Sequence, residues 1–139
     1  LDTAADVGSA PDFEEAVDVA ATLAVHALRS GLDVVVRTTS PDHPGQRTAL
    51  RSEAEVLDLL TPVQQSLTDT VVQLPTLFLH GFDHTSIVMV TGPLGPSSRI
   101  ASTDRMTTVR IGAGSQTTAT VGFAAESAVE FVNRWRSWM

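Results

Sequence analysis

The most regular hydrophobic pattern in the chain lies between Asp12 and Gly31. Its apolar residues recur every three or four positions, the spacing of one helix face: Phe13, Val17, Ala20, Ala24, Ala27 and Leu28. Asp12 and Glu15 have the spacing of a capping box, and Gly31 suits the position just after a helix end. The pattern predicts a long helix that begins near Asp12 and ends at Gly31. Further apolar residues widen its hydrophobic face, so we expect it to pack against a sheet and a neighbouring element.

Short runs of β-branched residues predict strands. Three such runs, each followed by a turn that contains glycine or proline, are Asp33–Thr39, Ser86–Thr91 and Thr107–Ile111. The second and third runs are apolar enough to be buried on both faces of a sheet. One more short strand is predicted near Ala119–Phe123, where β-branched residues follow a glycine-rich turn.

Further helices are predicted from start signals and periodicity. Ser52–Leu60 opens with Ser-Glu-Ala-Glu, a second capping box, and Glu126–Trp138 carries an apolar stripe at helical spacing. A short helix is also predicted around Pro75–Phe82. Helices and strands thus alternate, which predicts an α/β fold with a mostly parallel sheet flanked by helices. A length of 139 residues suits one domain, residues 1–139.

The first residues, Leu1, Asp2 and Thr3, have the character of a strand end and the loop that follows it. We therefore expect the body of this first, central strand to be truncated. Loss of a central strand would leave two strand edges unpaired, a situation that proteins cover or pair. The expected outcome is either a sheet re-formed from the remaining strands or a homo-oligomer joined through the exposed strand edges.

Composition removes several classes of function. The chain has no cysteine, which excludes disulfides, zinc thiolate sites and thiol catalysis, and all nine basic residues are arginine, which excludes lysine-based mechanisms. Nine basic against 16 acidic residues give a net charge of −7, which argues against non-specific binding to nucleic acid or anionic lipid. No apolar run is long enough to span a bilayer, and no signal peptide is present. We expect a protein partner.

Several segments together resemble one family. Leu1-Asp2-Thr3, the helix that opens at Asp12 and the strand that ends at Thr39 resemble the C-terminal part of domain-of-unknown-function family 58. The tail Ala128–Trp135 is similar to the closing helix of its actinobacterial members. The resemblance covers most of the chain and implies a von Willebrand factor A-like, Rossmann-like fold, in which ligands lie at the C-terminal ends of the strands.

The resemblance also implies a function. Members of family 58 are typically longer bacterial proteins with N-terminal membrane segments, often encoded beside a MoxR-type AAA ATPase. By this resemblance the chain is a non-catalytic protein-interaction module that works with such an ATPase and lies in the cytoplasm. We expect this segment to make no direct membrane contact, while membrane segments upstream would anchor the parent protein.

Von Willebrand A domains hold a magnesium ion with an Asp-x-Ser-x-Ser loop and with Thr and Asp side chains from other loops. Here Asp2 matches the first position, but Ala4 and Asp6 replace the two serines. A Thr-Gly-Pro tripeptide that begins at Thr91 stands where such domains often have Thr-Asp-Gly. The candidate magnesium ligands are therefore Asp2, Asp6 and Thr91, and we expect a degenerate site that holds no cofactor, because magnesium demands a nearly complete oxygen cage.

His80 and His84 suggest an alternative function, that of an enzyme. They stand four residues apart, and a regular helix would place them on one face with Asp83 nearby, as in a zinc-binding His-x-x-acid-His motif. The alternative function is thus a metal-dependent hydrolase that uses these residues. Gly81 weakens such a helix, and the sequence lacks a Gly-x-Ser-x-Gly nucleophile elbow, so we expect no catalytic residues.

Overall fold

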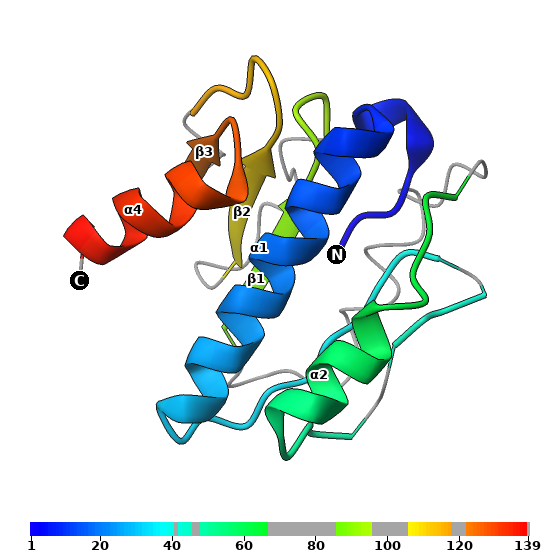
Figure 1. The fold of residues 1–139 in the computed structure, drawn as a ribbon, viewed down its shortest axis with the longest axis vertical. Helices are drawn as coiled ribbons and strands as arrows, with labels where there is room; N and C mark the ends of the chain where they lie inside the picture. The colour runs from blue at the N-terminus through cyan, green and yellow to red at the C-terminus, as the bar shows by residue number, and fades with distance from the viewer. Residues whose placement is uncertain (41, 46–47, 67–85, 96–105, 118–121, 139) are drawn as a thin grey trace.

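A computed structural model describes residues 1–40, 42–45, 48–66, 86–95, 106–117 and 122–138 (Figure 1). Its regular elements are, in chain order, the 3₁₀ turn η1 (Ala5–Val7), the helices α1 (Ala10–Arg29) and α2 (Glu53–Leu60), the strands β1 (Ile87–Thr91), β2 (Met106–Ile111) and β3 (Phe123–Ala125), and the helix α4 (Ala128–Trp138). Three helices accompany three strands, so the predicted α/β class is confirmed.

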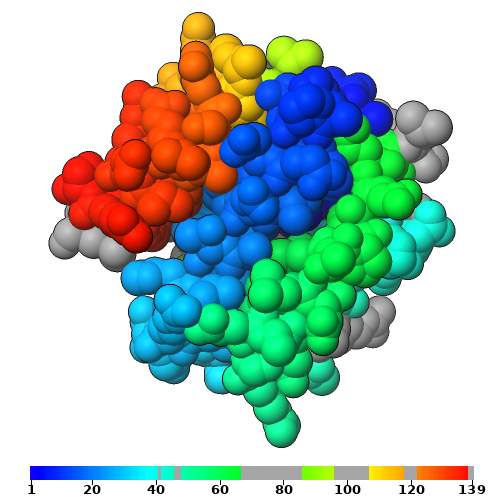
Figure 2. Space-filling model, viewed as in Figure 1, coloured from blue at the N-terminus to red at the C-terminus, as the bar shows by residue number. Residues whose placement is uncertain are grey.

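The three strands form one parallel sheet in the order β1-β2-β3. Val90 pairs with Val109 between β1 and β2, and Ile111 pairs with Ala125 between β2 and β3. Helix α1 crosses one face of the sheet, with α4 on one side of it and α2 on the other (Figure 1, Figure 2). Because the strands are parallel, their C-terminal ends meet at one edge, which we call the strand-end edge.

Leu1 and Asp2 extend the sheet beyond β1. The Asp2 amide donates to the Val90 carbonyl at 2.8 Å. On the other side, the Leu1 nitrogen donates to the Arg37 carbonyl at 2.7 Å, and the Thr39 amide donates to the Leu1 carbonyl at 3.0 Å. This alternation is the hydrogen-bond pattern of a parallel pair. The first residues therefore lie between β1 and the segment that ends at Thr39, and all three segments end at the strand-end edge.

The segment Asp33–Thr39 is not the regular strand that its composition predicts. Away from Leu1, its described backbone pairs are isolated antiparallel bridges, at Val34 and at Arg37. On the side of Pro44 the bridge at Arg37 is not continued, because Pro44 has no amide hydrogen to extend a ladder.

Helix α1 begins at Ala10 rather than at Asp12. Ser9 is the N-cap, since its hydroxyl oxygen accepts from the Asp12 amide at 3.3 Å, while the Asp12 carboxylate accepts from the Ser9 amide at 2.9 Å. The capping box therefore joins Ser9 to Asp12, and the predicted box of Asp12 and Glu15 is wrong. Both pairs have the same three-residue spacing, so the spacing alone could not distinguish them.

Asp12 and Glu15 also join α1 to other elements. Asp12 Oδ1 accepts from the Ala113 amide at 3.1 Å, in the turn after β2, and Glu15 Oε2 accepts from the Ala128 amide at 2.6 Å, at the first residue of α4. The Ser9 hydroxyl above all, aided by the Ser9 and Ala113 amides, holds the pKa of the Asp12 carboxyl below its usual value. Each carboxylate thus stabilises a helix N-terminus, where negative charge is favoured.

The remaining boundaries follow the sequence signals with small shifts. Helix α2 begins after Ser52, whose hydroxyl oxygen accepts from the Glu55 amide at 3.2 Å. The strand predicted near Ala119–Phe123 corresponds to β3, which begins at Phe123 and ends at Ala125, two residues past the predicted end. The helix predicted around Pro75–Phe82 lies outside the described residues.

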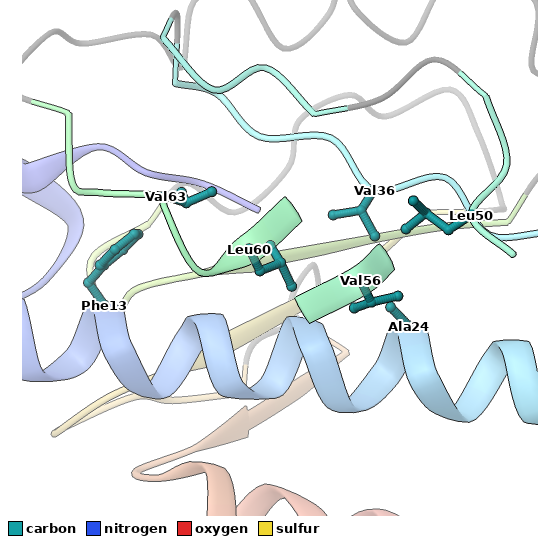
Figure 3. Close-up of a cluster of buried hydrophobic side chains, with 7 residues drawn as sticks. All are labelled: Phe13, Ala24, Val36, Leu50, Val56, Leu60 and Val63. Carbon is teal, nitrogen blue, oxygen red and sulfur yellow. The ribbon is translucent and has the colours of Figure 1, made fainter. Parts of the chain in front are cut away.

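Helix α1 separates two hydrophobic cores. The α2-side core lies between α1 and α2 (Figure 3); its buried side chains are Phe13, Ala24, Val36, Leu50, Val56, Leu60 and Val63. The sheet-side core lies between α1, the sheet and α4; its buried side chains are Ala16, Val19, Val90, Val109, Ile111, Ala125 and Phe131. The helix therefore buries two faces, as the width of its hydrophobic surface predicts.

An aromatic cluster closes the sheet-side core under α4. The Phe131 ring is fully buried, with its centroid 5.1 Å from that of Phe123 and 5.6 Å from that of Trp135. The contact with Phe123 is edge-to-face and that with Trp135 is stacked, both favourable arrangements for aromatic rings. Phe131 thus fixes α4 against β3.

The outer side of β3 is covered by an arginine. The Ala125 carbonyl accepts from the Gly112 amide on the β2 side, so the neighbouring Ala124 carbonyl points away from β2. Arg134 Nη1 donates to this Ala124 carbonyl at 2.9 Å. An edge carbonyl with a side-chain partner is a poor acceptor for another strand, which is one way in which proteins protect sheet edges.

Replacement of Asp12 tests whether the stability that the N-cap of α1 provides depends on pH. Asp12→Ala removes the cap contact and the link to Ala113, and should lower the free energy of unfolding by about 1–2 kcal/mol at pH 7. Because the native pKa lies below the unfolded value of about 3.9, this stabilisation is present above that pH and disappears as the pH falls through the native pKa. Urea unfolding across this range measures the difference.

The matched control is Asp18→Ala, at an exposed position in the middle of the same helix, which should cost less stability at pH 7. A difference between wild type and Asp12→Ala that stays constant down to the lowest pH at which the protein folds would contradict the assignment.

Phe131→Ala tests the sheet-side core. Truncation of this fully buried ring leaves a cavity beside Phe123 and Trp135, and should lower the free energy of unfolding by about 3–5 kcal/mol. Val129→Ala, at an exposed site on the same helix, is the control and should change stability by no more than about 0.5 kcal/mol. Denaturant midpoints that shift equally in the two variants would show that α4 is not packed as described.

Candidate functional site

Buried polar side chains gather at the strand-end edge: Asp2, Thr3, Thr38, Thr39, Ser40 and Thr91. They come from three segments that are far apart in the sequence and adjacent in the sheet. Ligands of open α/β sheets lie at this edge, and buried polar groups need hydrogen-bond partners. The strand-end edge is therefore the candidate functional site, and the partners of these side chains decide its chemistry.

The carboxyl group of Asp2 lies at the centre of this group. Its Oδ2 accepts from the Thr91 hydroxyl at 2.8 Å. Its Oδ1 accepts from the Ala4 amide at 3.1 Å and from the Thr39 hydroxyl at 3.4 Å. Asp2 is only 1% exposed and Thr91 is fully buried. The Asp2 side chain thus joins the first residues of the chain to the end of β1 and to the segment that ends at Thr39.

A second set of contacts surrounds Thr3 and Thr39. The Thr3 amide donates to the Thr39 hydroxyl oxygen at 2.8 Å, and the two hydroxyl oxygens lie 3.0 Å apart. The Thr38 hydroxyl donates to the His43 carbonyl and accepts from the Ser40 amide at 3.2 Å. These hydroxyl groups are therefore engaged in holding backbone segments together.

The turn that follows β1 closes the edge over Thr91. The Gly95 amide donates to the Gly92 carbonyl at 3.0 Å, and the Leu94 amide donates to the Val7 carbonyl at 2.8 Å. Gly95 lies so close to Thr91 that a Cβ atom there would collide with the hydroxyl and the methyl group of Thr91. Only glycine allows this approach, so residue 95 fixes the side chain that donates to Asp2.

The residues at this edge do not fit a magnesium cage, which needs about six oxygen ligands in octahedral geometry. Ala4 has no side-chain oxygen, Asp6 is exposed on η1, and Thr91 donates its hydroxyl proton to Asp2. The hollow lined by Asp2, Ala4 and Gly92 has no volume for a water molecule. Of the three candidate ligands, the structure brings Asp2 and Thr91 together as hydrogen-bond partners and leaves Asp6 at the surface.

The other proposed metal ligands, His80, Asp83 and His84, lie outside the described residues. Among the residues that the structure describes, no three His, Asp or Glu side chains are grouped so that they could hold a metal ion. Within the same ranges, no helix combines the length and the apolar character needed to cross a membrane. Besides the strand-end edge, the described part of the chain has a larger hollow that bears on function.

That hollow has a volume of about 430 Å³ and lies between α2 and the loop after Ser40; its lining is Asp42, His43, Pro44, Gly45, Glu55, Asp58, Leu59 and Pro62. Glu55 already accepts from the Arg51 amide at 2.6 Å. The sequence gives no sign of this hollow, because its residues come from two segments with no shared motif. It has an acidic lining but no observed feature that selects a ligand.

The roles of Thr3 and Thr39 were not predicted from the sequence. Three hydroxyl residues in succession, Thr38, Thr39 and Ser40, follow an apolar run with only Arg37 between, and this is the signal that could have indicated them. Hydroxyls at the end of a buried strand point to the edge where segments meet. Their partners could not be named without the fold.

No family model, no curated protein and no solved structure matches the chain. The class of protein is therefore defined by the structure, as an α/β protein with a three-stranded parallel sheet that is consistent with a Rossmann-like arrangement.

Gly95→Ala tests the closure of the edge over Thr91. The added methyl group collides with Thr91 and should displace its hydroxyl from Asp2, at a cost of about 1–3 kcal/mol in the free energy of unfolding. Thermal and urea unfolding measure the loss, and the amide NMR signal of Ala4, which donates to the same carboxyl group, should shift. An unchanged melting temperature with an unchanged Ala4 signal would show that Gly95 is not in contact with Thr91.

Proposed function

We propose that the chain is a non-catalytic protein-interaction module that contacts its partner through the loops at the strand-end edge. The observation that carries the proposal is Leu94, which is 76% exposed on the turn after β1. A single exposed leucine is in itself normal on a protein surface. Leu94 differs because the turn that presents it is hydrogen-bonded to two neighbouring elements, η1 and β2.

Hydrogen bonds hold the turn on both sides of Leu94. Its own amide donates to the Val7 carbonyl of η1, and the Gly95 carbonyl accepts from Arg110 Nη2 of β2 at 2.7 Å. A preordered turn loses little conformational entropy when a partner binds, so its contacts contribute more fully to affinity. Leu94 therefore has the properties of an apolar anchor residue.

The surroundings of Leu94 suit contact with a protein. The turn after β2 packs beside Pro93 through Gly112 and presents the exposed small residues Ala113 and Gly114. Asp6, next to Val7, adds an exposed carboxylate. The polar groups under these turns are hydrogen-bonded to one another and face inward. The surface of the strand-end edge therefore presents to a partner an apolar anchor, small residues around it and one acidic group.

The partner that we propose is a MoxR-type AAA ATPase, the class implied by the resemblance to family 58. The net charge of −7 favours a partner that presents basic groups around an apolar pocket. An exposed carboxylate beside an apolar anchor is complementary to such a surface.

Leu94→Glu tests the proposal with a purified MoxR-type AAA ATPase from the same source. A charge in place of the anchor should weaken binding by at least about tenfold, as measured by calorimetry or biolayer interferometry. Leu57→Glu is the matched control, since Leu57 is 53% exposed on α2, away from the strand-end edge, and it should bind like the wild type. Equal affinity of the two variants would place the contact elsewhere, and no binding of the wild type would rule out this partner.

A further inference from the structure

The hydrogen bonds to the Asp2 carboxyl group, which we call the junction at Asp2, hold three segments of the chain together. This structural role is separate from partner binding. The junction connects three segments that share no covalent link nearby: the first residues of the chain, the end of β1 at Thr91 and the segment that ends at Thr39. In an α/β fold with ligands at this edge, a bound cation can hold such segments together, because each segment supplies an oxygen ligand. Here the same three segments meet with the hydroxyl groups in direct contact with the carboxyl group.

The direction of the hydrogen bonds distinguishes the two arrangements. A cation needs the lone pairs of the threonine and aspartate oxygens to point at one common position. Thr91 Oγ1 instead donates to Asp2 Oδ2 at 2.8 Å, so its proton lies between the two oxygens where the lone pairs would otherwise converge on an ion. The hydroxyl of Thr39 and the amide of Ala4 donate to Oδ1, so both carboxyl oxygens already have donors.

The packing around Asp2 leaves no space in which an ion could replace these hydrogen-bond donors. The hollow beside Asp2 cannot hold a water molecule, and Gly95 presses on the side chain of Thr91. Ala4, which is also buried here, has no side-chain oxygen to offer an ion. An ion could enter only if Thr91 turned away from Asp2 and the turn at Gly95 moved.

We infer that the hydroxyl groups of Thr39 and Thr91 take the place of a divalent cation, and that the strand-end edge is a hydrogen-bonded junction that is independent of divalent cations. The inference concerns the junction alone and does not depend on the proposed partner.

The first experiment measures thermal unfolding of the wild-type chain with EDTA and with millimolar Mg²⁺ or Mn²⁺. The melting temperature should differ by less than about 1 °C among these conditions, because no ion binds the native state preferentially. The amide NMR signal of Ala4, a donor to Asp2, should likewise not move when Mg²⁺ is added. A rise of several degrees with either ion that is abolished by Asp2→Asn would overturn the inference.

The second experiment removes the donor. Thr91→Val keeps the shape of the side chain but leaves Asp2 Oδ2 without its hydroxyl partner, and should lower the melting temperature by about 5–10 °C. Thr108→Val is the matched control: Thr108 is a fully buried threonine on β2 whose hydroxyl has no hydrogen-bond partner among the described residues. Its loss should change the melting temperature by less than about 2 °C, since no bond is broken.

Equal effects of Thr91→Val and Thr108→Val would show that the hydroxyl of Thr91 does not hold the junction. If Thr91→Val does not fold, Thr91→Ser keeps the donor while it loses the methyl group. It should then fold and leave the Ala4 amide signal close to its wild-type position, and failure of this variant to do so would also overturn the inference.

Discussion

The hydrogen bonds to the carboxyl group of Asp2 are the constraint on which the strand-end edge depends. An almost completely buried carboxyl group is costly unless donors reach both of its oxygens. Thr91, Thr39 and the Ala4 amide supply these donors from three separate segments. Each segment must therefore reach the Asp2 carboxyl group at the strand-end edge. This fixes the position of Thr91, and with it the point at which the turn after β1 leaves the sheet and exposes Leu94.

Helix α1 extends this constraint through the rest of the molecule. Its two buried faces form the α2-side core and the sheet-side core, so the helix cannot shift without disturbing both (Figure 1, Figure 3). At its N-terminus, Asp12 reaches the turn after β2, and Glu15 reaches the start of α4. The acidic residues that open α1 thus align the neighbouring loops of the strand-end edge, in addition to stabilising the helix.

The chemistry of the edge follows from this division of roles. Its polar side chains face inward and are bonded to one another, while Leu94 and small residues face outward. Catalysis needs polar groups with unused hydrogen-bonding capacity in a cleft, whereas recognition of a protein needs an ordered surface with an apolar anchor. The edge has the second set of properties, which is why we favour an interaction module as its function.

The sequence by itself determined the α/β class, and it placed the helices α1, α2 and α4 and the strands β1 and β2 to within two residues, because helical periodicity and β-branched runs are local signals. The predicted capping box of Asp12 and Glu15 was wrong, because Ser9 and Asp12, which form the box, have the same spacing. The sequence named Asp2 and Thr91 through a family pattern but missed Thr39. Only the tertiary structure decided that these residues bond to one another, because parallel strands bring together at one edge positions that lie far apart along the chain.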